Sequence, residues 1–236
     1  MSMITLEHLN NTIFNDRIDW QSIDRELALR STKCLELLHE ACLIEAYLPV
    51  YTGKMNELFW DDLDATSIFT IEAYEAYGHY FIIRKYLDIV GYNPVTDEEV
   101  LQVRSRDKDN VYTDKIRELV NFMGTEHFAA EFFKDLIKLT KEPVLKEMLK
   151  EFYVEEICHS QLAFDLLEKM MKKDPGVKRK ILEHVLNYQH IGAYVTPKVS
   201  PAKDDNLKVV LSFNKKIERL TGNSLSKFIA EQEGGL

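Results

Sequence analysis

The stretch Glu156-Ile-Cys-His159 places an acid and a histidine where a long helix needs apolar side chains. The surrounding residues recur at three- and four-residue steps, the spacing of one helix face: Leu145, Leu149, Phe152, Glu156, His159, Ala163, Leu166 and Met170. Such a stripe faces a core. Burying an isolated carboxylate is very costly, so the acid must be protonated, paired or bound to a metal. The stretch therefore predicts a buried acid and histidine with partners on other helices.

Three other predicted long helices also have an apolar face that includes at least one acidic residue. The complete set of candidate metal ligands is Glu45, Glu72, Glu75, His79, Glu126, Glu156 and His159. A single Glu-x-x-His pair in an acidic helical chain is more often surface decoration. Four independent stripes would each have to bury an acid without a reason, so the set predicts a two-metal site of the kind that helix bundles build from inward-pointing Glu and His.

The ligand types fit two Fe ions, with Mn as the alternative metal. Two divalent ions close together need several anionic oxygen ligands, and one imidazole each leaves positions open for O2 as co-substrate. Two single-site alternatives stay open. Glu45 precedes Pro49 closely and would then lie at a solvated helix end, and His79 would be a hydrogen-bonded core histidine.

Composition limits the class of protein. The 236 residues are 45% hydrophobic and 29% charged, as expected for a globular chain, and we expect one domain over residues 1–236. The net charge of −9 argues against nucleic acid as a partner. We expect neither a membrane span nor a signal peptide. Three cysteines without C-x-x-C spacing indicate free thiols in a reducing cytoplasm.

The predicted fold is all-α. We expect helices over about 22–47, from Asp64 or Ser67 to 90, and over about 96–106, 113–140, 143–171 and 177–194, followed by two shorter C-terminal helices. Pro49 is the expected stop signal of the first. Short loops make the first two long helices one antiparallel hairpin and the last two another, while a long crossover containing its own helix joins the hairpins. This is a ferritin-like four-helix bundle with additional C-terminal helices.

Several stretches resemble the soluble acyl-acyl-carrier-protein desaturases. They are Glu45-Ala-Tyr-Leu-Pro-Val-Tyr51, His79-Tyr-Phe-Ile-Ile-Arg-Lys-Tyr-Leu87, Glu126, Glu155-Glu156-Ile-Cys-His159, Leu167-Glu-Lys169 with Asp174-Pro175, Asp204-Asp-Asn-Leu207 and Leu220-Thr-Gly-Asn-Ser224. The matches are dispersed but occur in the family's order. The resemblance implies a di-iron enzyme in which Glu45, Glu126, Glu156 and the two histidines hold the metals.

Two positions depart from the family pattern. Ala76 stands where the family has a glutamate three residues before the second-helix histidine, and Ala129 stands where it has a threonine. Glu75 lies four residues before His79 and Glu72 seven before, about 40° and 20° away around the helix. Either can face the same metal. We favour Glu75 slightly, because a ligand pair on one helix usually lies within one turn.

The resemblance implies an O2-dependent di-iron oxidoreductase, most simply a desaturase of a carrier-protein-linked fatty-acyl chain, with an external electron donor such as ferredoxin. The departures make an oxygenase of a small biosynthetic intermediate the alternative, by hydroxylation, N-oxygenation or C–C cleavage. An iron-binding protein without an organic substrate is the third reading, and a homodimer is one assembly that the sequence allows. Phe122, Met123 and Phe152 are candidates for an apolar substrate slot or for plain core packing.

An acidic carrier protein needs a basic docking patch on an acidic enzyme. The candidates are Lys169, Lys172, Lys173, Lys178, Arg179 and Lys180 around the Asp174-Pro-Gly turn, and a smaller group of Arg104, Arg106 and Lys108. The alternative is that these side chains stay solvated and merely complement a helix dipole.

Overall fold

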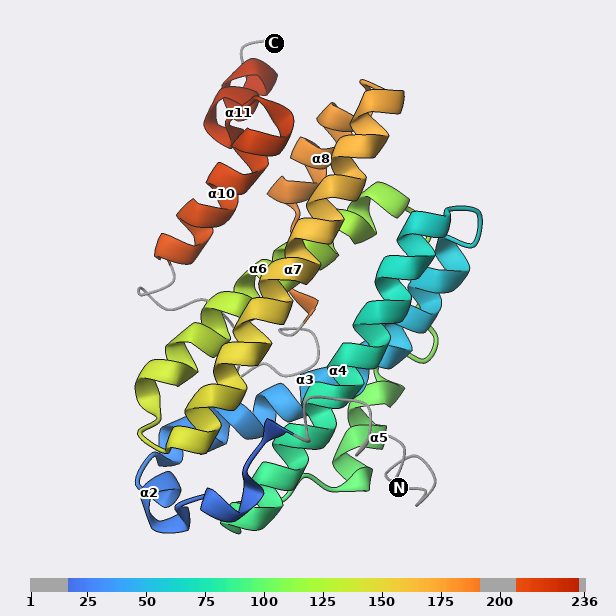
Figure 1. Cartoon of the computed structure of the whole chain (residues 1–236). Coiled ribbons are helices and arrows are strands. Elements are labelled where there is room, and N and C mark those ends of the chain that lie inside the picture. Colours follow the sequence, from blue (N-terminus) through green and yellow to red (C-terminus); the bar gives the residue numbers. More distant parts are fainter. Residues whose placement is uncertain (1–16, 192–206, 234–236) are drawn as a thin grey trace.

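Four long helices dominate the computed structural model, which describes residues 17–191 and 207–233. They are α3 (Thr32–Leu58), α4 (Leu63–Val90), α6 (Lys115–Leu139) and α7 (Pro143–Lys173). Helix α3 packs along α4 and α6 along α7, so the chain forms two hairpins that lie against each other (Figure 1). The crossover between the hairpins carries α5 (Asp97–Ser105). Every regular element in the described ranges is a helix, as predicted.

The shorter helices surround these hairpins. A 3-10 turn η2 (Trp20–Ser22) and helix α2 (Arg25–Leu29) precede α3, and α8 (Val177–Leu186) packs on α6. Helices α10 (Leu207–Thr221) and α11 (Leu225–Glu233) follow, with α10 against α6 and α8. One contiguous apolar core takes in residues from Ala28 to Phe228. The described part of the chain contains no helix with the length and apolar character required to cross a membrane.

Local signals explain where the long helices begin and end. Asp62 caps α4 by accepting from the backbone N–H groups of Asp64 and Ala65, and Gly91 ends it with a φ of 76° that favours glycine. Asp114 caps α6 in the same way as Asp62 caps α4. Pro143 occupies the first turn of α7, where its missing N–H costs no helical hydrogen bond.

The predicted end of the first helix at residue 47 is wrong, because Pro49 lies inside α3. A proline within a helix removes one hydrogen bond and costs about 3 kcal/mol. Here Tyr51, Thr52 and Met55 continue the helix in fully buried positions, and Thr52 donates its hydroxyl to the Leu48 carbonyl. Tertiary packing therefore overrides the stop signal, and Glu45 lies in the middle of a buried helix.

Other boundaries shift by less. The first predicted helix is divided into η2, α2 and α3, and α8 ends at Leu186 rather than near residue 194. Residues 192–206, which include Pro197, Pro201 and most of the Asp204-Asp-Asn-Leu207 stretch, lie outside the described residues.

Candidate metal centre

The two hairpins bring six of the seven candidate ligands into two adjacent groups. The first group contains Glu45, His79 and Glu156, and the second contains Glu72, Glu126 and His159. Within each group, one ligand atom per residue lies within 4.8 Å of the others. All six side chains are buried. Each group combines two carboxylates with one imidazole, the donor set expected for a transition-metal ion.

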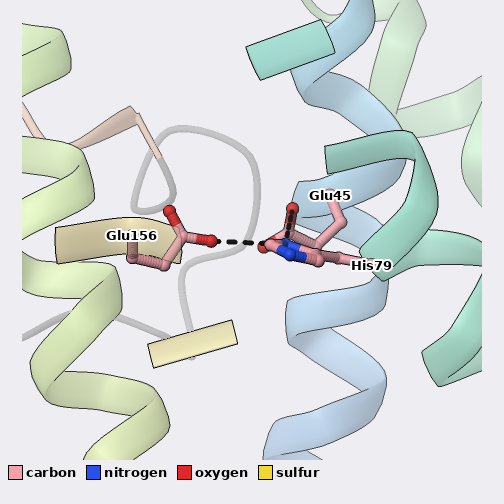
Figure 2. Close-up of side chains that lie close together, drawn as sticks. All are labelled: Glu45, His79 and Glu156. Carbon is pink, nitrogen blue, oxygen red and sulfur yellow. Dashed lines mark ion pairs between the residues drawn. The ribbon is translucent and has the colours of Figure 1, made fainter. Parts of the chain in front are cut away.

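The first group converges on Nδ1 of His79. This atom lies 3.4 Å from Oε2 of Glu45 and 3.3 Å from Oε1 of Glu156. Figure 2 shows the two carboxylates approaching the imidazole from different helices, Glu45 from α3 and Glu156 from α7. The burial of Glu45 leaves no support for a solvated helix end at this position.

The second group converges on Nδ1 of His159 in the same manner. Oε2 of Glu72 is 2.8 Å away and Oε2 of Glu126 is 4.0 Å away. Glu156 also reaches this imidazole, with Oε2 at 3.2 Å. One oxygen of Glu156 therefore faces each histidine, and this carboxylate lies between the two groups.

The outer nitrogens of both imidazoles are hydrogen-bonded to acids of the opposite helix. Nε2 of His159 on α7 lies 2.5 Å from Glu75 on α4, and Nε2 of His79 on α4 lies 2.6 Å from Glu155 on α7. A carboxylate at Nε2 fixes the ring orientation and leaves Nδ1 facing the buried carboxylates, where a metal ion could bind it. The reciprocal arrangement gives both histidines the same support.

This geometry reverses the preference for Glu75 over Glu72. The sequence argument placed the ligand within one turn of His79, but Glu75 lies beyond the imidazole of His159 and about one third of its side chain is exposed. Glu72 reaches inward in a fully buried position and serves the group of His159, not that of its own helix's histidine. The sequence argument did not consider a ligand that crosses to the other group.

Glu155 is a residue whose role the sequence reasoning missed, since it was not among the candidate ligands. The acidic pair Glu155-Glu156 contained the signal. Adjacent positions on a helix point about 100° apart, so one acid can face the metal while its neighbour reaches the outer side of a histidine.

Buried polar atoms without hydrogen bonds test whether the site fits metal ions. Among the described residues, Glu45 Oε2, Glu72 Oε2, Glu126 Oε1 and His79 Nδ1 have no hydrogen-bond partner. Glu72 Oε2 meets His159 only as an ion pair, without hydrogen-bond alignment. Such atoms are rare in folded proteins and each needs an explanation. Four of them converging in one place fit cations as their missing partners.

The proton affinities of the cluster support the same interpretation. Burial raises the pKa of Glu45 to about 7 and that of Glu126 well above its usual range. For His79 and His159, burial opposes protonation, but the surrounding carboxylates outweigh it and raise both pKa values. The pKa of Glu156 is lowered despite burial, because the neighbouring Glu126 and the two histidines stabilise its anion. Protons thus hold the positions that metal ions would take.

The three aromatic and apolar candidates for a substrate slot pack in the core. Phe122, Met123 and Phe152 are all fully buried. The Phe152 ring lies 4.2 Å from the imidazole of His79, centroid to centroid, and also contacts Phe133. Neither described cavity is lined by them. Phe152 thus lies beside the candidate site, whereas Phe122 packs on Phe69 in the core.

Comparison with known proteins identifies no relative: the chain matches no family model, no curated protein and no solved structure. The interpretation of the site therefore depends on its own residues.

Proposed function

We propose that this protein is a ferritin-like, two-metal oxidoreductase that uses O2, with iron as the first candidate and manganese as the second. The observation that carries the proposal is the pair of Glu–Glu–His groups joined through Glu156, with four buried polar atoms that lack hydrogen bonds. Two adjacent three-ligand groups in a helix bundle fit a dinuclear centre better than any arrangement of ordinary core ion pairs.

The residues divide naturally between two ions. Glu45 and His79 would hold one ion, and Glu72, Glu126 and His159 the other, while Glu156 lies between the two groups. When bound, such a pair of redox-active ions supplies the electrons and coordination positions for O2 reduction.

The protein's own residues orient and protect this centre. Glu75 and Glu155 fix the two imidazoles through their outer nitrogens. Phe133 and Phe152 exclude water from the side of His79. Three cysteines that form no disulfide fit a reducing cytoplasm, where we place the protein.

The resemblance to acyl-carrier-protein desaturases supports a carrier-linked acyl chain as substrate. The net reaction would balance when two hydrogens of the chain, two electrons from two reduced ferredoxins or a similar donor, and two protons from solvent reduce O2 to two waters. The predicted docking patch is partly neutralised in the structure: Lys169 pairs with Asp64, Lys172 with Glu168 and Arg179 with Glu183. Such exposed pairs contribute little to stability, because water and salt screen them, so a carrier can displace them.

A second candidate, the oxidation of a small polar molecule, is favoured by the cavity beside the bundle. This cavity of about 350 Å³ lies between α3 and α6, and most of its lining side chains are tyrosines, amides or charged groups, with Val111 and Ile191 as the aliphatic exceptions. A long acyl chain would gain little from such walls.

Metal analysis of protein produced in iron-rich medium tests the proposal. We expect about two Fe per chain, reduced to one or none in Glu156→Ala and unchanged in Glu131→Ala, whose carboxylate pairs with Lys134 on the surface. Fewer than about one transition ion per chain in the wild type would rule the proposal out. A large hollow assembly by size measurement would favour iron storage, and a monomer or dimer would favour catalysis.

Carrier docking has its own test. Charge reversal at Lys178, Arg179 and Lys180 should raise the KM for a carrier-bound substrate and leave that for the free acid unchanged. An equal response to both substrates would exclude docking at this patch and favour the small-molecule candidate.

A further inference from the structure

One buried acid outside the metal groups remains to be explained. Glu118 lies on α6 and is only 5% exposed, and it lines the cavity between α3 and α6. It accepts a long hydrogen bond from the Tyr51 hydroxyl at 3.4 Å and a second from the Asn121 side chain, yet burial still raises its pKa. The nearest cation, Arg117, reaches it only at 3.9 Å and has a half-exposed side chain. A carboxylate in this setting is poorly compensated for the loss of water.

Three tyrosines line the cavity around Glu118. Tyr47, Tyr51 and Tyr112 line the same cavity, and the rings of Tyr51 and Tyr112 meet edge to face with centroids 5.6 Å apart. Aromatic faces beside a buried carboxylate form the usual recognition site for a cationic nitrogen, since both attract positive charge. Asp114 adds a second acid at the rim, where it pairs with His184.

The cavity adjoins the proposed metal centre. Its inner wall comes from α3 and α6, the helices that carry Glu45 and Glu126. Tyr51 links the two places, because it donates to Glu118 and also lies close enough to Glu126 for the charge of that acid to raise its pKa. Glu118 precedes Glu126 by eight residues, which is about 12 Å along the helix axis. The cavity and the metal groups therefore lie about two helical turns apart along α6, and none of the six candidate ligands lines the cavity.

We propose that Glu118 selects substrates that carry a basic nitrogen, and that the cavity takes small amines with an apolar or aromatic body. The inference rests on the proposed two-metal oxidase and refines its small-molecule candidate. The ammonium group would give Glu118 a closer positive partner than Arg117, and the tyrosines would cover the carbons next to the nitrogen. The end of the molecule remote from the nitrogen would point toward the side of the cavity nearer the metal groups. This class of substrate differs from a carrier-linked acyl chain in both size and charge.

Binding to the metal-loaded protein tests the proposal with probes of matched size. Calorimetry compares 2-phenylethylamine with 2-phenylethanol and hexylamine with hexan-1-ol, which differ only in the charged group. The wild type should bind each amine about tenfold more tightly than its alcohol, the range of one hydrogen bond to a charged group. Glu118→Gln keeps the shape of the side chain and should reduce the preference to less than about twofold without weakening alcohol binding.

Glu57→Gln is the matched control, because it removes an exposed acid from α3 outside the cavity, and it should keep the full preference. Equal binding of amine and alcohol by the wild type would overturn the proposal, as would a preference that survives Glu118→Gln. Metal content is measured in the same samples. Two ions per chain without amine preference would refute only the role of Glu118, whereas a chain that binds no metal would refute the proposed function itself.

Discussion

Oε2 of Glu75 lies 2.5 Å from Nε2 of His159, the ring nitrogen that faces away from the buried carboxylates. An acid in this position orients a histidine without touching a metal. Glu72, three residues earlier on the same helix, meets the same imidazole at its other nitrogen. The two glutamates therefore contact opposite nitrogens of the same histidine, and replacing each one separately distinguishes their roles.

We predict that Glu72→Ala removes about one metal ion per chain, while Glu75→Ala retains both ions with an affinity lowered about 10- to 100-fold. The first variant loses a carboxylate from the centre, and the second loses only the support of His159. Equilibrium titration with a competing chelator measures both numbers. Equal stoichiometry losses in the two variants would contradict this division of roles.

Gly124 on α6 is predicted to tolerate no side chain. A Cβ at this position would lie 2.4 Å from Cε2 of Tyr188, whose ring stacks on Phe128. We expect Gly124→Ala to lower the free energy of unfolding by about 1–3 kcal/mol, as overpacking does. Gly53→Ala in α3 is the control: a Cβ there meets nothing within 4 Å, so alanine should stabilise the helix by about 0.5–1 kcal/mol. Urea unfolding gives both values, and opposite signs are the essential result.

Glu142 joins three parts of the fold and should be sensitive to truncation. It is fully buried at the start of α7, accepts from the backbone N–H of Leu145 at 2.7 Å and from the Tyr86 hydroxyl at 3.1 Å, and also meets the N–H of Asp24. Glu142→Ala loses a helix cap and leaves buried donors without partners. We expect a loss of about 2–4 kcal/mol in the free energy of unfolding.

Glu147→Ala, one turn later in α7, provides the comparison for this loss. Its carboxylate is exposed and pairs with Lys150, so stability should change by less than about 0.5 kcal/mol. Similar losses at the two positions would show that Glu142 acts only as an ordinary surface acid.

Two histidines should make the metal-free protein sensitive to mild acid. Burial lowers the pKa of His127 and of His190 to about 4, and Lys216 adds to the effect at His127. A histidine with a lowered folded-state pKa binds fewer protons in the folded than in the unfolded chain. Stability is therefore full above about pH 6.5 and falls as the pH drops toward 4.

His190→Phe should reduce the stability lost between pH 7 and pH 5 by about 2 kcal/mol, since it removes one such group. Chemical unfolding at the two pH values measures the difference, with chelator present so that metal loading does not contribute. An unchanged pH dependence in the variant would place the acid sensitivity elsewhere.

The helical architecture could be predicted because local signals agree with it at most places. Gly91 ends α4 as expected, and Asp62 and Asp114 cap α4 and α6 within about two residues of the predicted starts. Pro49 led to a predicted helix end that the structure does not have. The helix continues past Pro49 because Tyr51, Thr52 and Met55 are buried against other helices, and such tertiary packing cannot be read from local sequence. Six candidate ligands could be found from apolar stripes, since each stripe reports which helix face is buried.

The division of work among those residues could not be predicted. Helical spacing gives the direction of Glu72 and Glu75 around α4, but not which imidazole of another helix each one meets. The same holds for Glu155, whose partner lies 76 positions away in the sequence. These contacts depend on how two helices are aligned against each other, and a single sequence carries little information on that alignment.

The metal groups divide the chain into two halves that need each other. Glu45, Glu72 and His79 come from the first hairpin, and Glu126, Glu156 and His159 come from the second, yet each group draws on both. A ribosome that has released only the first hairpin has made two ligands of one group and a single ligand of the other. An ion bound by either group would therefore require both hairpins to be made and packed together, so metal content would report complete assembly of the bundle.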